Sequence, residues 1–419
     1  MIIRLFVILF LSIQGQAFSG QILIPMDPGS QSQHLKAYGI TYWVIEQDIR
    51  VQWLLNYRGG SFLIPDGENI RRECRIRGVD FELISDQQAA QIISYIGSPS
   101  QNMEAVQLDK APKVAVYAPP GMQPWDDAVT MVLTYAEIPF TTIYDTEVLG
   151  DELLLYDWLH LHHEDFTGQY GKFYRSYRMA PWYLEQKKSA ESLAQSLGYQ
   201  KVAQAKRDVA LKIRDYVIGG GFMFAMCSAT DSFDIALAAQ NTDICESMFD
   251  GDPSTPNYQA QIDFTHSFAF TDFLLERDPM VYEFSDIDMT RKRQIDREKD
   301  YFTLMDFSAK WDPIPCMLNQ NHTAIVKGFM GQTTAFDPSV IKPNVLVMGR
   351  NEVNGEARYL HGIRGKGFFT FYAGHDPEDY QHRVGDPKTE LALHPNSPGY
   401  RLILNNILFP AAKKKKQKT

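Results

Sequence analysis

Two residues that could perform covalent chemistry follow apolar runs far apart in the sequence. Cys227 ends the run FMFAMC, and His375 follows the run GKGFFTFYAG. If both runs are parallel strands, the two side chains meet at the C-terminal edge of one sheet, where open α/β sheets bind their ligands. A cysteine nucleophile needs a base, and the base needs an orienting carboxylate. The pattern therefore predicts that Cys227 attacks, that His375 accepts its proton, and that Glu378 or Asp376 orients His375.

The sequence around Cys227 predicts a sharp turn from a strand into a helix. Three glycines precede the strand, and DSFDIALAA (231–239) has the composition of a helix. Such a turn holds a nucleophile beside backbone N–H groups that stabilise an oxyanion, here around Ser228. The N-terminus of the helix also favours the thiolate. The alternative is that Cys227 is a small, inert core residue at the end of a strand.

Three of the ten histidines fall within four positions, in the segment WLHLHHED. If this segment begins as a strand, His160 and His162 lie on one face, and His163 and Glu164 follow them. Imidazole nitrogen and carboxylate oxygen bind zinc and similar ions, so one expectation is a divalent metal at His160, His162 and Glu164. The alternative is a ligand site without a metal, because no HExxH spacing is present. The basic and aromatic residues at 172–178 suit an anionic or sugar-like ligand.

Alternating strand-like and helix-like segments would position these residues. Strands are expected at 113–120, 139–145, 152–160, 222–227, 344–349, 356–363 and 365–376, and helices at 125–136, 184–217, 231–239 and 400–409. This alternation predicts βαβ units and a mostly parallel sheet of the α/β class. The binding site would then collect four strand ends, at 119–121 with Gly121, at 160–164, at 227–228 and at 375–378.

Two further regions flank or interrupt this sheet. Residues 21–105 predict an N-terminal α+β block, in which 37–45 and 61–65 are rich in strand formers and 79–96 has the pattern of a strand, a cap and a helix. The polar stretch 98–112 is expected to be a linker. Residues 240–340 predict an insertion, which would be either a lid over the site or plain scaffold.

Composition narrows the class of protein. The chain has 419 residues and a net charge of -10, which argues against a nucleic-acid partner. Four cysteines exclude a disulfide scaffold, and the pairing of Cys74, Cys245 and Cys316 with one another or with Cys227 stays open. Residues 1–20 have the pattern of a signal peptide, so export to the periplasm or the extracellular space is expected, with no transmembrane span in the mature chain. The basic tail 411–419 is expected to be solvated, or attracted to an anionic membrane surface.

Several segments together carry a resemblance to known families. The closing segment, with GKGFFTFYAGH and RLILNNILFP, resembles trehalose-utilisation (ThuA-like) proteins. The helix, glycine turn, strand and elbow at 211–237 resemble class I glutamine amidotransferase-like folds. The whole chain, including LLLYDWLHLHHEDFTGQYGKF, is similar to a family of exported bacterial proteins often labelled asparagine synthetase B. The resemblance implies a flavodoxin-like sheet in an amidotransferase-like domain that spans 113–410.

The resemblance implies two alternative functions. The amidotransferase likeness implies a Cys-dependent hydrolase or amidase that acts on a C–N bond. ThuA-like proteins generally lack the cysteine, which implies non-catalytic binding of a carbohydrate or another small ligand; protein partners are not specified. The elbow reads AMCSA where amidotransferases have Gly-x-Cys-x-Gly, and His375 is followed by Asp-Pro-Glu instead of Pro-Glu. Asparagine synthesis is not implied, because the chain lacks the N-terminal catalytic cysteine and the Ser-Gly-Gly-x-Asp-Ser loop for ATP.

Overall fold

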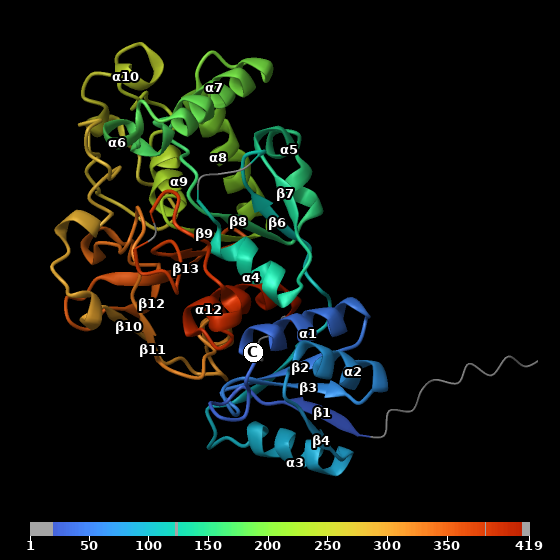
Figure 1. The fold of residues 1–419 in the computed structure, drawn as a ribbon. Coiled ribbons are helices and arrows are strands. Elements are labelled where there is room, and N and C mark those ends of the chain that lie inside the picture. Colours follow the sequence, from blue (N-terminus) through green and yellow to red (C-terminus); the bar gives the residue numbers. More distant parts are fainter. Residues whose placement is uncertain (1–19, 122–124, 382, 413–419) are drawn as a thin grey trace, which may run out of the picture.

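The computed structural model describes residues 20–121, 125–381 and 383–412. The expected signal peptide, apart from Gly20, and the basic tail after residue 412 lie outside the described residues. The described chain is a mixed α/β structure with two sheets, a small N-terminal one and a large mixed one (Figure 1).

The small sheet is antiparallel in all four of its pairings. Its strands lie in the order β4-β1-β3-β2-β5. Their bounds are β1 (Gln21–Ile24), β2 (Val51–Leu55), β3 (Ser61–Pro65), β4 (Glu82–Ile84) and β5 (Glu104–Leu108). Three helices accompany them, α1 (His34–Glu46), α2 (Glu68–Arg77) and α3 (Asp86–Gly97). The helix expected after residue 84 is confirmed, and its start is fixed by a capping box between Ser85 and Gln88.

The structure corrects two expectations in the N-terminal block. Residues 37–45 lie in helix α1, although their β-branched and aromatic side chains favour a strand. The helix is packed between the small sheet and the rest of the protein (Figure 1), so burial on most sides overrides local propensity. A Cβ on Gly39 would lie 1.8 Å from the carbonyl oxygen of Ala136, which shows how closely α1 approaches the next domain. The expected linker 98–112 contains strand β5, which pairs with β2.

The large sheet is mixed, which corrects the expected mostly parallel sheet. Five parallel strands are joined to an antiparallel extension, and the extension contains the expected strands 344–349 and 356–363. The order of the whole sheet is β11-β10-β12-β13-β14-β9-β8-β6-β7. The parallel strands are β6 (Val114–Tyr117), β7 (Thr141–Ile143), β8 (Trp158–Leu161), β9 (Phe222–Met226) and β14 (Gly367–Tyr372). The extension consists of β10 (Tyr301–Leu304), β11 (Ile325–Lys327), β12 (Leu346–Arg350) and β13 (Ala357–Arg364). From the edge inward, the parallel strands lie in the order β7-β6-β8-β9-β14. The first two strands in the chain are therefore exchanged, and the others follow in chain order.

Helices α4, α12, α8 and α9 cover the two faces of the parallel part. The helices of this part of the chain are α4 (Ala128–Ala136), α5 (Asp145–Leu149), α6 (Tyr174–Tyr177), α7 (Pro181–Ser196), α8 (Val202–Gly219), α9 (Ala229–Ala238), α10 (Ser247–Asp250), α11 (Pro313–Leu318) and α12 (Pro398–Leu408). One face packs against α4 and α12 in an apolar core that continues into the small sheet. The other face packs against α8 and α9. Because the central strands are buried on both faces, they are nearly continuous apolar runs.

Two helical expectations differ in detail. The single helix expected at 184–217 is two helices, α7 and α8, separated by a turn around Gly198. The run 152–160 begins as a short 3-10 helix (Glu152–Leu155) before β8. Among the described residues, no helix combines the length and the apolar character needed to cross a bilayer.

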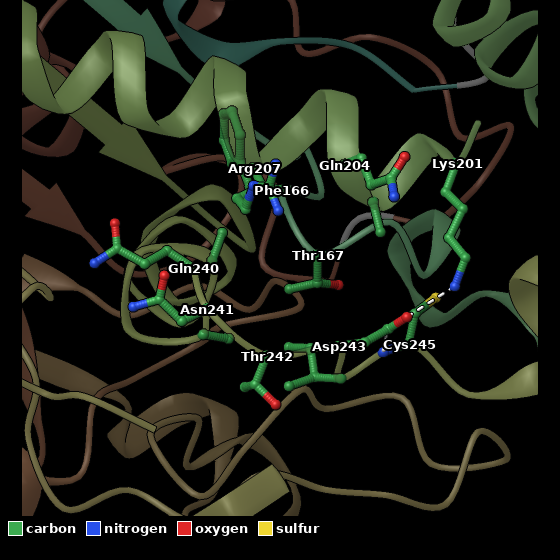
Figure 2. A pocket seen from close by; sticks show the side chains of 14 residues that line it. Phe166, Thr167, Lys201, Gln204, Arg207, Gln240, Asn241, Thr242, Asp243 and Cys245 are labelled. Carbon is green, nitrogen blue, oxygen red and sulfur yellow. Dashed lines mark hydrogen bonds and ion pairs between the residues drawn. The ribbon is translucent and has the colours of Figure 1, made fainter. Parts of the chain in front are cut away.

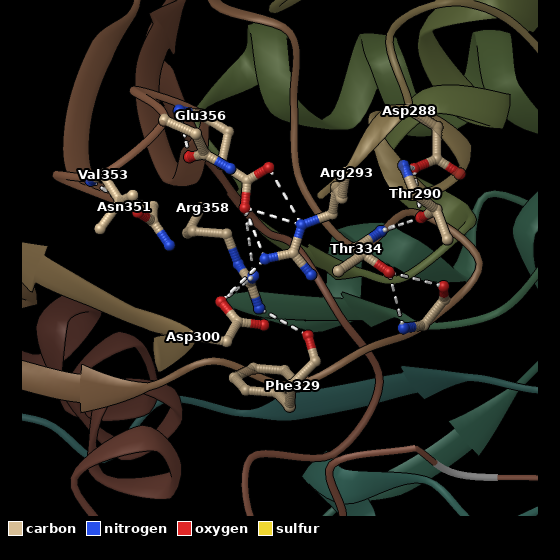
Figure 3. Close-up of polar contacts among 12 residues, drawn as sticks. Asp288, Thr290, Arg293, Asp300, Phe329, Thr334, Asn351, Val353, Glu356 and Arg358 are labelled. Carbon is tan, nitrogen blue, oxygen red and sulfur yellow. Dashed lines mark hydrogen bonds and ion pairs between the residues drawn. The ribbon is translucent and has the colours of Figure 1, made fainter. Parts of the chain in front are cut away.

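The region 240–340 is built into the sheet domain. It supplies β10 and β11 at one edge of the large sheet. A buried ionic cluster anchors it (Figure 3): Arg293 Nη2 lies 2.8 Å from Asp300 Oδ1 and 2.6 Å from Glu356 Oε1. Arg358 lies beside the same carboxylates and donates to the carbonyl oxygen of Phe329. The cluster therefore fixes the start of the segment that follows Phe329, which reaches the C-terminal edge of the parallel strands.

Candidate functional site

Strand register brings the predicted residues to one edge of the large sheet. Leu161 of β8 is opposite Ala225 of β9, and Met226 of β9 is opposite Tyr372 of β14. The chain leaves all three strands in the same direction. His162 and Cys227 directly follow β8 and β9, and His375 is the third residue after β14. Adjacent strands lie about 4.8 Å apart, so these segments are neighbours. This edge is therefore the place where the two distant signals in the sequence meet.

Cys227 occupies a strained turn between β9 and α9. Its φ is 52°, a left-handed conformation that is uncommon for a residue with a side chain. The turn is held by the N–H of Ala229, which donates to the carbonyl oxygen of His162 across 2.8 Å. The hydroxyl of Thr230 donates back to the carbonyl oxygen of Cys227 across 2.7 Å. The sequence thus folds locally as the predicted elbow.

The thiol of Cys227 is covered. The residue is 3% exposed, and its Sγ accepts a hydrogen bond from the N–H of Gln332 at 3.3 Å. The Gln332 side chain donates from Nε2 to the carbonyl oxygens of Gly171 at 2.7 Å and Tyr282 at 3.0 Å. Residues 330–333 therefore form a cover, which we call the Gln332 segment. The region 240–340 accordingly acts both as scaffold and as the cover of this edge.

The Gln332 segment also contacts the strand end that carries His375. The N–H of His375 donates to the carbonyl oxygen of Met330 at 2.9 Å, and that of Gly374 to Thr333 at 2.8 Å. A Cβ on Gly331 would lie 2.8 Å from the backbone nitrogen of His375, closer than real side chains approach. The close fit fixes the position of His375 relative to the cover.

The carboxylate beside His375 comes from a different segment than expected. Asp126 Oδ1 lies 3.7 Å from His375 Nε2. Asp376 instead accepts hydrogen bonds from Thr389 Oγ1 at 2.6 Å and from the Tyr400 hydroxyl at 2.8 Å.

Glu378 is also engaged elsewhere. Its Oε2 lies 3.2 Å from His394 Nδ1. The expectation that Asp376 or Glu378 orients His375 is therefore corrected. Both residues fix the chain after β14, and Asp126 takes the place beside the imidazole.

The predicted histidine cluster is present and larger than expected. The rings of His162 and His375 stack with centroids 4.5 Å apart, and the centroids of His162 and His163 lie 4.8 Å apart. His162, His163 and His375 each offer a nitrogen within 4.8 Å of the others. Burial, together with the charges of His162 and His375, holds the pKa of His163 well below its usual value. His163 is thus favoured as a neutral imidazole, which is the form that binds metals.

Asp127 is a second carboxylate that the sequence did not single out. Its Oδ2 lies 3.1 Å from His160 Nε2 and 3.3 Å from His162 Nδ1. Burial alone would raise the pKa of Asp127, but the two histidines hold it well below the usual value. Its Oδ1 caps α4 by accepting from the N–H groups of Val129 and Thr130. The only signal in the sequence was the pair Asp126-Asp127 just before helix α4. An aspartate in that position is usually just a helix cap.

Glu164 is not a member of this cluster, which corrects the expected set of metal ligands. Its Oε2 lies 4.0 Å from Lys206 Nζ, within a buried network that includes Asp145, Tyr117 and Tyr144. Burial raises the pKa of Glu164 to about 7 although Lys206 opposes the shift. The grouping of potential ligands around His160 and His162 contains Asp127 instead.

The remaining predicted residues lie at or near the edge. Gly121 is exposed in the loop that follows β6, and its φ is 99°. Residues 122–124, which come next, lie outside the described part. Ser228 is buried, and its hydroxyl has no hydrogen-bond partner among the described residues.

Aromatic side chains form a wall next to the histidines. The ring of Trp125 lies 4.9 Å from His163 in an edge-on contact, and 5.3 Å from both Phe173 and Trp182. The indole Nε1 of Trp125 is buried and has no hydrogen-bond partner among the described residues. The aromatic segment noted near 172–178 therefore reaches the site through Phe173.

Two cavities lie away from this edge. One, of about 310 Å³, is shown in Figure 2 and is lined by residues at the start of α8 and after α9, including Lys201, Gln204 and Asn241. Lys201 is already engaged by the carboxylate of Asp243 at 2.8 Å. The other, of about 280 Å³, includes Asp288. Neither cavity is lined by Cys227 or by the histidine cluster.

The cysteines are all free thiols. Cys74, Cys227, Cys245 and Cys316 are buried and form no disulfide. Burial raises the pKa of Cys74 and of Cys316 to about 12. The open question of disulfide pairing is thus resolved in favour of four separate thiols, and Cys227 is available as a thiol.

Comparison with known proteins gives no family assignment. No protein-family profile matches the chain, and no curated protein matches it. Two solved structures show a distant likeness: "Cytoplasmic Protein STM3548 from Salmonella typhimurium" is 11% identical with a TM-score of 0.34. "Cytoplasmic Protein STM1381 from Salmonella typhimurium LT2" is 13% identical with a TM-score of 0.35. Each match covers 72% of this chain and 100% of the other.

Proposed function

We propose that this protein is an exported, amidotransferase-like hydrolase that cleaves a C–N bond with Cys227 as the nucleophile. The observation that carries the proposal is the φ of 52° at Cys227, between a buried parallel strand and the helix that follows it. A strained turn of this kind presents a nucleophile next to backbone donors at a helix start. The strand order of the parallel part supports a flavodoxin-like fold, whose ligands bind at this same edge.

The proposed reaction uses three side chains. The Cys227 thiol passes its proton to His375 and attacks the carbonyl carbon of an amide, and backbone N–H groups around Ser228 stabilise the oxyanion. His375 returns the proton to the leaving amine, and water then hydrolyses the thioester with His375 as base. Asp126, 3.7 Å from His375 Nε2, orients the imidazole. Since Gln332 covers the thiol, substrate binding requires the Gln332 segment to move.

The test is a screen of small amides against the full mature chain and its Cys227→Ser variant. Release of ammonia or amine by the wild type, lost in the variant, supports the proposal. Turnover that is undiminished in Cys227→Ser rules out a thiol nucleophile. Sequencing of the N-terminus of the protein recovered from the periplasm tests the proposed export, which rests on the pattern of residues 1–20.

A second candidate is a non-catalytic, ThuA-like protein that binds a carbohydrate or another small polar ligand. It is favoured by the burial of Cys227 at 3% exposure beneath Gln332. In this case the histidines and the aromatic wall around Trp125 would contact the ligand, because aromatic faces and polar groups recognise sugars together. A ligand that binds equally well to wild type and Cys227→Ser, without turnover, would favour this candidate.

A further inference from the structure

We infer that His160, His162 and Asp127 form a binding site for a divalent transition-metal ion, with zinc as the best-matched ion. The three side chains come from β8, from the residue after it, and from the start of α4. This site is separate from the proposed Cys227–His375 pair and requires neither residue.

Two of the three distances between the ligand atoms fit a tetrahedral ion, and all three atoms lie within 4.8 Å of one another. Asp127 Oδ2 lies 3.1 Å from His160 Nε2 and 3.3 Å from His162 Nδ1. Ligands at about 2.0 Å from a tetrahedral zinc ion are about 3.3 Å from one another. Two histidines and one carboxylate also form a set that leaves a coordination position open.

Both ring nitrogens of His160 face oxygen atoms. Nδ1 lies 3.3 Å from the carbonyl oxygen of Phe224, which can only accept, and Nε2 lies 3.1 Å from Asp127 Oδ2. When Nδ1 donates to Phe224, the lone pair of Nε2 points toward the carboxylate, which is the arrangement of a histidine and a carboxylate that share a metal ion. His160 is fully buried.

A second observation comes from His162. Its side chain is 1% exposed, its Nε2 forms no hydrogen bond with a described residue, and its Nδ1 lies at the ion-pair distance of 3.3 Å from Asp127 Oδ2. Buried polar groups usually have well-formed partners. A metal ion shared with His160 and Asp127 would give Nδ1 a bond that this ion pair alone does not.

The outer contacts are those of an oriented metal site. His160 is held by the carbonyl oxygen of Phe224, and Asp127 by two N–H groups of α4, at 2.8 Å and 2.9 Å. Such contacts fix the ring and carboxylate orientations before the ion binds. Because His162 stacks on His375 with centroids 4.5 Å apart, the ion would lie directly beside the proposed catalytic edge.

The test is a zinc titration of the full mature chain after treatment with a chelator, using a chromophoric competitor. We expect one zinc ion per chain and a rise in the thermal unfolding temperature. Asp127→Asn and His160→Gln should each weaken zinc binding at least about tenfold. Asparagine also caps helices, so Asp127→Asn should stay folded, as circular dichroism will show.

Matched variants separate this site from its neighbours. Asp126→Asn, His163→Gln and Cys227→Ser should bind zinc as the wild type does. Loss of binding in His163→Gln with retention in Asp127→Asn would overturn the assignment and place the ion on the His162, His163 and His375 grouping. Absence of zinc binding by the wild type would also overturn it, and would leave a shared proton between His160 and Asp127. Because Cys227→Ser should lose turnover and still bind zinc, failure of the metal site and failure of the proposed hydrolase can be told apart.

Discussion

The backbone N–H of Gln332 donates a hydrogen bond to Sγ of Cys227 at 3.3 Å, although the two residues are 105 positions apart. The region that interrupts the parallel strands therefore covers the proposed nucleophile. Access to the thiol depends on the anchors that hold Gln332 in place, and these are carbonyl oxygens of Gly171 and Tyr282.

Gln332→Ala should open the cover of Cys227. The variant removes both side-chain hydrogen bonds and leaves the two carbonyl oxygens without their donor, at a cost of about 1–3 kcal/mol. We expect the alkylation rate of Cys227 in the native protein to rise several-fold, measured by peptide mass spectrometry. Thr323→Ala, on an exposed loop, serves as the control. An unchanged rate in Gln332→Ala would show that these anchors do not limit access.

Asp126 and Asp376 should affect different properties of the protein. If Asp126 orients His375 as proposed, Asp126→Asn should lower turnover of an amide substrate about 10- to 100-fold, with little loss of stability. Asp376→Ala should instead lower the free energy of unfolding by about 1–3 kcal/mol, since it leaves the buried hydroxyl of Tyr400 without its acceptor. Turnover and urea unfolding of both variants provide the comparison. Equal turnover in Asp126→Asn and wild type would exclude the orienting role.

Asp231 should make stability depend on pH. Burial raises the pKa of its carboxyl to about 7, although a hydrogen bond from Thr333 opposes the shift. The unfolded chain releases this proton near pH 4, at about the usual pKa of 3.9. Between about pH 4 and 7 the folded state therefore binds more protons, so stability falls as the pH rises through that window.

Asp231→Asn should remove that part of the dependence. The variant should be more stable than wild type at pH 7.5, by up to about 4 kcal/mol for a three-unit shift. Urea unfolding from pH 4.5 to 8 measures the effect, and Asp215→Asn, at a side chain that is 61% exposed, is the control. Parallel stability curves for Asp231→Asn and wild type would contradict this account.

Lys206 should be structural. Its Nζ donates to Asp145 Oδ1 at 3.0 Å and to the Tyr117 hydroxyl at 2.9 Å, in the buried network that also holds Glu164. Lys206→Met leaves a buried carboxylate without its cation, so unfolding should become easier by about 3–5 kcal/mol. Lys212→Met breaks a partly exposed pair with Asp151 and should cost less than about 1 kcal/mol. If both variants lost similarly small amounts of unfolding free energy, the buried network around Lys206 would not contribute to stability as expected.

The sequence predicted the five parallel strands and the strand-to-helix turn at Cys227, but not that the runs at 344–349 and 356–363 pair antiparallel and make the sheet mixed. Runs such as 113–120 and 222–227 are continuous and apolar because both faces of their strands are buried, and this signal is local. Helix α1 was mispredicted because its strand-forming residues are buried by tertiary packing on most sides. Strand β5 was missed because five residues in a polar stretch carry little periodicity.

The carboxylates of the site were the least predictable part. Asp126 and Asp127 lie in a connection where an acidic residue before a helix is usually a cap, and Asp127 is one. Only the register of β6, β8, β9 and β14 places them beside His375 and His160. Glu378 and Asp376 were favoured for their proximity in sequence to His375, and proximity in sequence does not determine which carboxylate faces a ring.

The alkylation rate of Cys227 in the native protein as a function of pH tests the proposed nucleophile most directly. Cys74, Cys245 and Cys316 are internal controls, because burial raises the pKa of each of these thiols. The account predicts that Cys227 is labelled in the native protein and faster than the other three, because only an accessible thiolate reacts. Labelling of Cys227 only after denaturation, together with the other three, would contradict it.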